Sequence, residues 1–236
     1  MNQVPPEALA KLAVAPLFQE MTEDQIHRYC GGGTWRRLSE GNNLFFKDDP
    51  AGMMFVIVEG YFSVEAETSA GETVLLKLRG PGEILGELSV VVETGRTADV
   101  VALTPARVYA WPAAAMQEGL EDDPLLSQGM IRLLGDKLVE SMNDRVASFY
   151  PVESRLAHAL LDLARRTGVR QEDRSVEIPL VLSQRTLSRL VHCSREYTNK
   201  ALSRMRKDGV ITYTDGGHLR LLQLKSLRAM AEPSVT

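Results

Sequence analysis

The chain has 236 residues, 44% of them hydrophobic, which is enough for two domains with cores of their own. No apolar run is long enough to span a membrane, and the N-terminus lacks the basic and apolar regions of a signal peptide, so we expect a cytoplasmic protein without membrane partners. Two cysteines are too few for an iron–sulfur cluster, the four histidines lack metal-ligand spacing, and no nucleophile–base pair is evident, so neither a metal site nor an enzyme is predicted.

Charge is divided unevenly along the chain. Residues 1–151 hold 12 Lys and Arg against 22 Asp and Glu, a balance of −10, whereas residues 152–236 hold 15 against 9, a balance of +6. An acidic half joined to a basic half indicates that only the second half meets nucleic acid, although a solvated basic surface would give the same balance.

The first half is predicted to be an antiparallel β-roll that follows a short helical segment over residues 6–30. Between residues 34 and 112, runs of β-branched and aromatic residues alternate with glycine turns, a pattern typical of a small all-β barrel or roll. The expected strands are 54–58, 61–65, 73–77, 98–102 and 106–110.

Two glycine-containing segments, Gly80–Ser89 and Gly95–Ala98, predict a small pocket for a phosphodiester. Gly86 lets the backbone approach a ligand, and the amides of the next three residues can open a helical turn whose N-terminus attracts an anion. Arg96 can then fork onto two phosphate oxygens. The alternative is an ordinary glycine-rich turn beside a surface arginine. The residues assigned to the pocket are Gly86, Glu87, Leu88, Ser89, Arg96 and Thr97.

Glu87 narrows the class of ligand. A carboxylate next to a phosphate is unfavourable because like charges repel. Its presence is explained if it accepts a hydrogen bond from a ribose hydroxyl of the same ligand, which favours a cyclic nucleotide over free phosphate.

A long helix is predicted from about Pro124 to Phe149, with apolar residues at steps of three and four. In one interpretation, this apolar stripe packs on the β-barrel of the same chain. Most of the stripe would remain exposed in that case, and pairing with the same helix of a second subunit would bury it, so we expect a homodimer. Pro151 ends the helix and marks a hinge. The stripe consists of Ile131, Leu134, Leu138, Met142, Val146 and Phe149.

The sequence of the last part of the chain predicts a DNA-binding region. After a helix over 153–167 and a polar loop over 168–175, two short helices each follow a serine that can cap them, Ser183 and Ser194. Residues 183–207 carry seven basic residues and one acidic residue, as major-groove readout requires; the alternative is a basic helix in a three-helix bundle. The residues assigned to DNA are Arg185, Ser194, Arg195, Glu196, Asn199 and Lys200.

Beyond these helices, residues 210–214 and 218–222 flank Asp215-Gly-Gly217, which predicts a hairpin and therefore a winged helix-turn-helix.

The complete pattern resembles the CRP/FNR family of bacterial transcription regulators. The resemblance rests on Ala15-Pro-Leu-Phe18, on glycines 41, 52, 60, 71 and 82, on the phosphodiester motif, and on Cys193-Ser-Arg-Glu196 with Lys200. It implies an α+β chain with an effector β-roll (1–123), a dimerisation helix with its hinge (124–151) and a winged helix-turn-helix (152–236).

The resemblance also implies partners and site residues. A cyclic nucleotide, cAMP or cGMP, would switch a homodimer that binds a near-palindromic double-stranded DNA site and contacts RNA polymerase. Arg195, Glu196 and Lys200 would touch bases, in a DNA half-site whose core resembles dG-dT-dG-dA. Arginine is commoner than lysine at the position of Lys200 in this family. Lysine cannot make the two parallel hydrogen bonds to a base that arginine can make.

Two residues of the long helix bear on base choice. In cAMP-binding relatives this helix offers a threonine and a serine to the adenine ring, and the corresponding residues here are Glu140 and Ser141. A carboxylate can accept two hydrogen bonds from guanine but faces a lone pair on adenine, so Glu140 favours cGMP if it points inward and says nothing if it lies in solvent.

Two competing hypotheses remain open. The first is a regulator of the same fold that acts without a ligand or with another effector such as cyclic di-GMP. The second is a regulatory module that does not bind DNA, which the helix-turn-helix disfavours.

Overall fold

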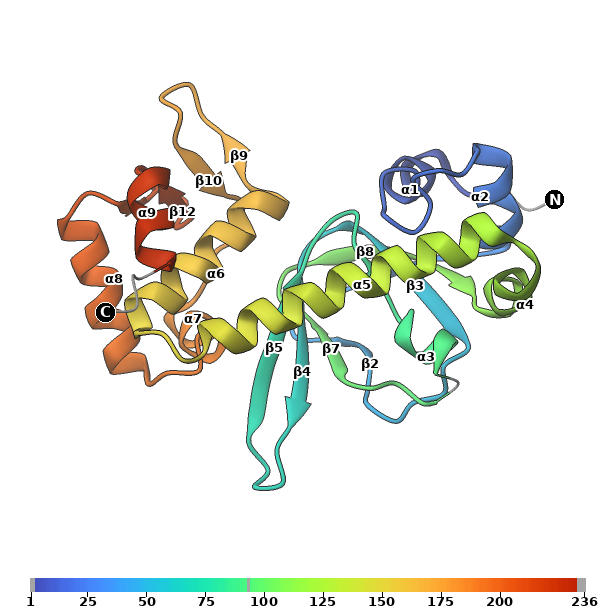
Figure 1. Ribbon diagram of the computed structural model, residues 1–236, viewed down its shortest axis with the longest axis horizontal. Helices are drawn as coiled ribbons and strands as arrows, with labels where there is room; N and C mark the ends of the chain where they lie inside the picture. Colours follow the sequence, from blue (N-terminus) through green and yellow to red (C-terminus); the bar gives the residue numbers. More distant parts are fainter. Residues whose placement is uncertain (1–2, 93, 233–236) are drawn as a thin grey trace. The chain divides into compact units, whose positions relative to one another are not determined.

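The computed structural model describes residues 3–92 and 94–232, and these form two compact units (Figure 1). The first unit ends at Glu140 and the second begins at Ser141. This division falls inside the segment predicted as dimerisation helix and hinge.

The first unit contains two four-stranded antiparallel sheets, as the β-roll prediction requires. One sheet has the order β1-β8-β3-β6 and the other the order β2-β7-β4-β5. The strands are β1 (Thr34–Leu38), β2 (Asn43–Phe45), β3 (Met53–Glu59), β4 (Phe62–Glu67), β5 (Thr73–Arg79), β6 (Ile84–Leu85), β7 (Asp99–Ala102) and β8 (Ala106–Pro112).

Strand β3 shows how the two sheets share their apolar residues. Its side chains alternate between faces, so Met54 and Val56 enter a core under the helices, whereas Phe55 and Ile57 enter the core between the sheets. A strand buried on both faces reads as a continuous apolar run, which is why Met53–Glu59 lacks polar alternation.

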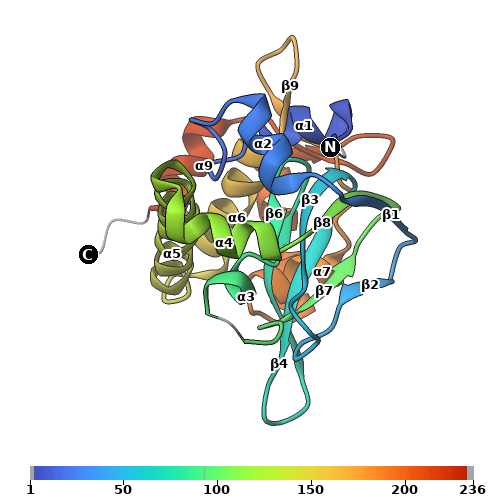
Figure 2. The same ribbon diagram turned by 90° about the vertical axis from the view of Figure 1, so that its right-hand side faces the viewer.

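Helices cover the outer face of the β1-β8-β3-β6 sheet. They are α1 (Pro6–Leu12), α2 (Glu23–Cys30), α4 (Ala114–Asp122) and the first turns of α5 (Pro124–Ala147), and α3 (Leu88–Val91) is a single turn beside the strands (Figure 2). Thr22 and Gln25 form a capping box that begins α2. Helix α4 was not predicted, because it has no capping side chain and few long apolar residues.

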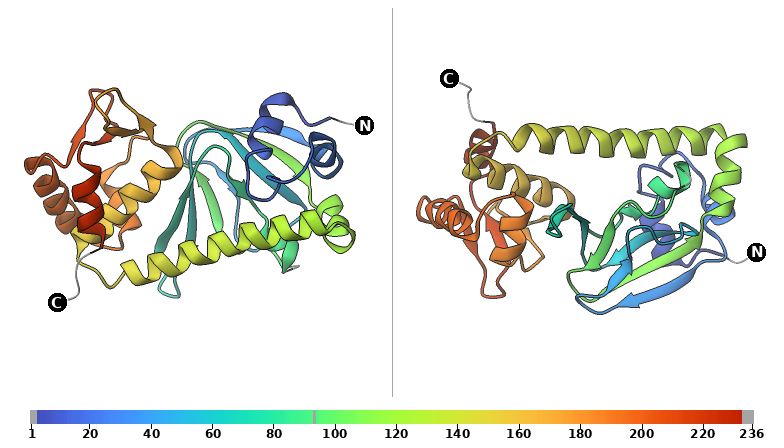
Figure 3. Two further views of the ribbon diagram at one scale, coloured as in Figure 1. Left: turned by 45° about the horizontal axis from the view of Figure 1, so that its top comes forward. Right: turned by 90° about the horizontal axis from the view of Figure 1, so that it is seen from below.

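Helix α5 is one continuous helix (Figure 3). Pro124 starts it, a position where the missing N–H costs no hydrogen bond, and it stops before Pro151 restrains the preceding residue. The predicted end at Phe149 was two residues too late. One face of the helix, with Leu126 and Met130, is buried in the core of the first unit.

The second unit contains the predicted winged helix-turn-helix. Its helices are α6 (Val152–Thr167), α7 (Gln184–Leu190), α8 (Arg195–Lys207) and α9 (Leu224–Ala231), and its four-stranded sheet has the order β11-β12-β10-β9. The strands are β9 (Val169–Arg170), β10 (Val176–Ile178), β11 (Ile211–Tyr213) and β12 (Leu219–Leu221).

The polar loop predicted at 168–175 was wrong in part. Val169 and Arg170 form β9 and pair with β10, although both side chains are exposed. A two-residue strand has too little alternation to be recognised in a sequence. Helix α9 was also missed.

Within residues 3–92 and 94–232, no helix is long and apolar enough to cross a bilayer. The same part of the chain holds no group of three or more histidine, cysteine, aspartate or glutamate side chains placed to bind a metal ion.

Candidate functional site

The predicted phosphodiester motif folds around Gly86 and Arg96. Gly86 adopts φ 86°, in the left-handed region that favours glycine, and directs the chain from β6 into α3. A Cβ at this position would lie 2.4 Å from Arg96 Nη1, so only glycine allows the guanidinium to come this close.

Arg96 is 3% exposed and is fixed on several sides. Nη1 donates to the Gly86 carbonyl at 3.2 Å and Nη2 to the Met53 carbonyl at 2.5 Å, while the guanidinium lies 4.4 Å from the centre of the Phe45 ring. Burial lowers the pKa of Arg96, and the nearby Glu87 carboxylate opposes that effect. Arg96 Nε is buried without a hydrogen-bond partner among the residues that the structure describes, so this N–H is available as a donor.

Glu87 is the residue just before the α3 turn, where its side chain makes no capping hydrogen bond, and it is 4% exposed. Lys137 of α5 lies 2.7 Å from its Oε1 atom and also donates to the Ile84 carbonyl at 3.1 Å. The acidic residue that looked out of place beside a phosphate is therefore already neutralised by a lysine from another element.

The other residues of the motif have simpler environments. Ser89 is buried, and its hydroxyl donates to the Gly95 carbonyl at 3.3 Å, which ties the two halves of the motif together. Leu88 and Thr97 are exposed.

Glu140 points inward, with its side chain 16% exposed, so it is not a solvated residue on the flank of the helix. Its Oε2 lies 2.8 Å from Arg79 Nη2 and its Oε1 lies 3.0 Å from Lys77 Nζ. Arg79 also pairs with Glu83 at 2.8 Å. Burial opposes ionisation of Glu140, but hydrogen bonding and charge from Arg79, assisted by Lys77, lower the pKa of its carboxyl to about 2.

Ser141 follows Glu140 on α5 and is exposed. Because both Glu140 oxygens are held by cations, the helix presents a compensated ion cluster here, and a guanine base would have to exchange partners with it.

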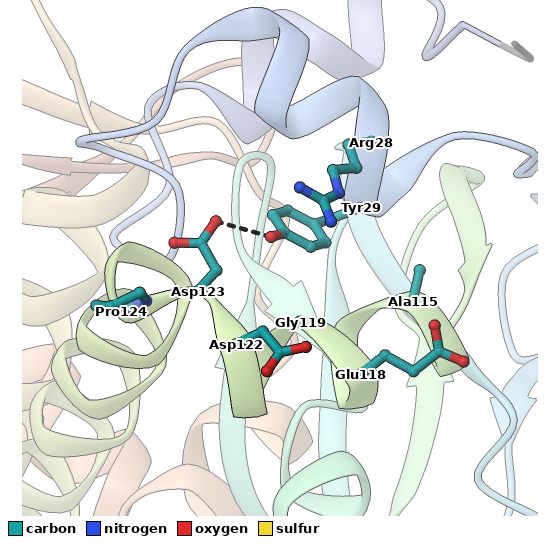
Figure 4. Close-up of a pocket in the computed structure, with 8 residues that line it drawn as sticks. All are labelled: Arg28, Tyr29, Ala115, Glu118, Gly119, Asp122, Asp123 and Pro124. Atoms are coloured by element: carbon teal, nitrogen blue, oxygen red, sulfur yellow. Dashed lines mark hydrogen bonds between the residues drawn. The ribbon is translucent and has the colours of Figure 1, made fainter.

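A separate cavity of about 500 Å³ lies between α2 and α4 (Figure 4). Tyr29 donates to Asp123 at 2.7 Å across it, and Arg28, Glu118 and Asp122 line it. A Cβ at Gly119 would lie 2.4 Å from the Tyr29 ring, so this glycine serves the packing of α2 on α4. None of the predicted site residues line this cavity.

The predicted DNA-binding region contains two helices that each begin with a serine cap. Ser183 accepts from the Thr186 amide at 3.0 Å, and Ser194 accepts from the Tyr197 amide at 3.4 Å, so both predicted caps are confirmed. The inner face of α8 is buried, with Thr198, Ala201, Leu202 and Met205 toward the core of the second unit. Against it, α7 contributes the buried Leu187.

The outer face of α8 is exposed and ion-paired. Lys200 Nζ lies 2.6 Å from Glu196 Oε1, one turn away on the same helix. Arg185, Ser194 and Arg195 are exposed, while Asn199 is half-buried with its Oδ1 lacking a partner among the described residues.

The turn between the two helices contains His192 at φ 47°, in the left-handed region. Arg155 of α6 donates to its carbonyl at 3.3 Å, so the strained turn is tied to the helix behind it.

Known protein families match both units. The model of the cyclic nucleotide-binding domain matches residues 35–123, and that of the Crp-like helix-turn-helix domain matches residues 154–230. The CRP-like cAMP-activated global transcriptional regulator of Mycobacterium tuberculosis is 30% identical over 164 residues, which are 69% of this chain and 73% of that relative. The chain belongs to the CRP/FNR family.

Other known proteins are similar to this chain in sequence or in fold. A global nitrogen regulator of Synechococcus elongatus is 26% identical over 180 residues, 74% of this chain and 80% of the relative. The structure of FixK2 from Bradyrhizobium japonicum has a TM-score of 0.77 at 16% identity and covers 86% of this chain and 99% of its own. The c-di-GMP-responsive global regulator CLP of Xanthomonas campestris has a TM-score of 0.68 at 23% identity, and the match covers 85% of this chain and 99% of that one. The chain is thus a DNA-binding transcription regulator and not an enzyme.

Sequence reasoning missed three basic residues near the predicted phosphodiester motif: Lys77, Arg79 and Lys137. Lys77 and Arg79 are two residues apart on β5, so they share one face of the strand. Lys137 is three residues before Glu140 and lies on the same side of α5. Both spacings are visible in the sequence, but the contact between a strand and a distant helix is not.

Tyr197 was also missed. It is 62% exposed in the first turn of α8, and Lys200 Nζ lies 5.6 Å from its ring centre. An exposed aromatic among DNA-facing candidates can be found by the same helical spacing that selected Arg195 and Lys200.

Proposed function

We propose that this regulator is a homodimer whose affinity for DNA is switched by a cyclic mononucleotide, cAMP or cGMP. The observation that carries the proposal is the site formed by Gly86, Glu87 and Arg96, in which the buried Arg96 Nε has no partner among the described residues and lies near a buried carboxylate that a lysine neutralises. A cyclic phosphate supplies the acceptor for Arg96, and its ribose supplies a hydroxyl for Glu87.

The remaining assigned residues complete this site. The amides of Glu87, Leu88 and Ser89 face the anion at the start of α3, and Thr97 adds a hydroxyl. The base extends toward Glu140 and Ser141 on α5. Because α5 is anchored in the first unit and continues into the second, a ligand that contacts it acts on the element that leads to the DNA-binding helices.

The homodimer is supported by the apolar residues that α5 leaves exposed. Ile131, Leu138, Met142 and Val146 all face solvent, as does Phe149 just beyond the helix. Exposed apolar residues at this spacing are buried when two identical helices pair about a twofold axis.

The DNA-binding part of the proposal assigns Arg195, Glu196 and Lys200 to base edges, and Arg185, Ser194 and Asn199 to positioning contacts. A twofold dimer places two such helices one turn of DNA apart, so the site is near-palindromic. RNA polymerase is proposed as the further partner and the cytoplasm as the compartment.

Calorimetric titration with cAMP, cGMP and cyclic di-GMP tests the effector. We expect one cyclic mononucleotide to bind, and Arg96→Ala to abolish binding because it removes a charged donor from a buried site, about 1.5–3 kcal/mol for each lost hydrogen bond. Arg37→Ala is the matched control, since Arg37 is exposed on β1. Unchanged affinity of Arg96→Ala for every nucleotide tested would remove the pocket assignment.

The same titration tests base choice. If Glu140 exchanges its cations for a guanine edge, the wild type prefers cGMP and Glu140→Thr shifts the preference toward cAMP. Equal affinities that the substitution leaves unchanged would confine Glu140 to its ion pairs and make cAMP the default ligand.

A second candidate is a regulator of this fold that acts without a ligand or with cyclic di-GMP. It is favoured by the ion pairs that already occupy Glu87 and Glu140, and by the likeness in fold to the c-di-GMP-responsive regulator CLP. DNA binding that is equally tight with and without every mononucleotide would select this candidate.

A further inference from the structure

Helix α5 directs two opposite charges toward the effector motif. Lys137 reaches Glu87 and the Ile84 carbonyl, whereas Glu140, one turn later, reaches Lys77 and Arg79 on β5. The two contacts are chemically separate. Only the first involves a residue that the proposed function assigns to the ligand's phosphate and ribose.

The contact of Lys137 is selective for one oxygen of Glu87. Its Nζ atom lies 2.7 Å from Oε1, and Oε2 makes no hydrogen bond to any residue that the structure describes. Glu87 can therefore accept a ligand hydroxyl on Oε2 while Lys137 keeps Oε1.

The charge balance makes this lysine necessary. Glu87 is almost completely buried and close enough to Arg96 to influence its ionisation. Without a cation of its own, a buried carboxylate would repel the phosphodiester that Arg96 is placed to bind. With Lys137 in place, the Glu87–Lys137 pair is neutral and Arg96 remains to balance the single charge of a cyclic phosphate.

We propose that Lys137 is a positioning residue of the effector site. It neutralises and orients the Glu87 carboxylate, so that the pocket accepts an anionic nucleotide with a free 2′-hydroxyl, and it makes α5 part of that recognition. The inference rests on the proposed function, because it deepens the role of the same pocket.

Calorimetry with cAMP, cGMP and 2′-deoxy-cAMP tests the inference on the full chain, using Lys137→Met, Glu87→Gln and the double variant. We expect Lys137→Met to weaken cyclic-nucleotide binding by about tenfold or more, the size of coupling found between neighbouring charged groups. Glu87→Gln should discriminate less than the wild type between cAMP and 2′-deoxy-cAMP, because a neutral amide oxygen is a weaker acceptor for the 2′-hydroxyl than a carboxylate.

The double variant supplies the readout that a merely structural lysine would not move. Removing the carboxylate removes the repulsion, so Lys137→Met/Glu87→Gln should bind more tightly than Lys137→Met alone and approach Glu87→Gln. Lys137→Gln repeats the comparison with a polar side chain of similar length, in case Lys137→Met does not fold.

Arg132→Met is the matched control. Arg132 also lies on α5 and pairs with Glu20 at 2.7 Å, but neither residue belongs to the effector motif, so nucleotide affinity should not change.

Three outcomes separate the hypotheses. If the wild type binds a nucleotide and Lys137→Met binds it with an affinity within twofold of that, the role of Lys137 is overturned, but the proposed function is not. A double variant no tighter than Lys137→Met would also overturn it, since the loss would not come from an uncompensated carboxylate. Failure of the wild type to bind any of the three nucleotides would overturn the proposed function and this inference with it.

Discussion

Arg195 and Glu196 stand in the first turn of α8 with exposed side chains, the position from which a recognition helix reaches base edges. Replacing either by alanine should cost about 1–3 kcal/mol on the cognate site and flatten discrimination at one base pair in each half-site. Glu196 holds Lys200 in the free protein, so Glu196→Ala should also alter the contact made by Lys200. Binding-site selection with each variant measures the preference.

Arg206 provides the control on the same helix. It is exposed near the end of α8, and its guanidinium lies 5.4 Å from the Tyr213 ring centre. Arg206→Ala should weaken binding evenly across sequences, if at all, and lower the salt slope by about one. An Arg195→Ala variant with the wild-type sequence preference would mean that α8 is not the reading helix.

Glu140 should make stability depend on acid pH. Its pKa is lowered from an ordinary 4.5 to about 2, so its contribution is complete above pH 4.5 and is lost as pH falls toward 2. Glu140→Gln should therefore reduce the free energy of unfolding near neutral pH and flatten its fall on acidification. Urea unfolding at several pH values measures both effects.

Glu121→Gln is the comparison for that experiment, because Glu121 is an exposed residue of α4 with no ion pair in the described part of the chain. If the acid dependence of Glu140→Gln matches that of the wild type, the ion pairs with Lys77 and Arg79 do not stabilise the fold.

At the scale of the element, α5 carries opposite faces with different surroundings. Leu126 and Met130 are buried in the first unit, but Leu138 is 63% exposed and Met142 and Val146 are exposed beside it. Burial of apolar surface is worth about 25 cal/mol per Å², so an exposed stripe of this length is a strong reason for a second helix to pack against it.

The double variant Leu138→Glu/Met142→Glu should convert the proposed dimer into a monomer, because two carboxylates per chain would have to be buried without partners. Analytical ultracentrifugation measures the change. Val14→Glu is the control, since Val14 is 72% exposed but lies outside α5. A wild type that is monomeric at every concentration would exclude the proposed interface.

At the scale of the whole molecule, the two halves of the chain differ in net charge, −10 for residues 1–151 and +6 for residues 152–236. The ligands proposed for the two halves differ as well. If a cyclic nucleotide raises the affinity for DNA by some factor, linkage requires that DNA raise the affinity for the nucleotide by the same factor. We expect a factor of about 5 to 150, the usual range of allosteric coupling. Titration of nucleotide with and without the DNA site, and of DNA with and without nucleotide, measures the factor twice.

One result of these titrations would contradict the prediction of coupling. Nucleotide binding whose affinity does not change when DNA is present would show that the two sites are uncoupled, and the nucleotide would then not be the switch. Arg96→Ala, which should not bind nucleotide, should show the DNA affinity of the unliganded wild type.

Much of this protein was determined by local pattern. The two serine caps, the apolar face of α8 and the glycine turns of the roll all depend on residues close together in sequence. The sequence therefore predicted the fold class and the order of the main elements, whereas the roles of the residues assigned to the two candidate sites remain predictions.

Tertiary structure alone decided which distant residues meet. Lys137 lies 50 residues after Glu87, and Glu140 lies more than 60 after Lys77 and Arg79, so no local periodicity connects them. The sequence left open whether Glu140 faced solvent or a base, and the packing of α5 on β5 placed it between two cations instead. Burial makes such charges seek partners across the fold, and a partner's identity depends on the path of the backbone between them.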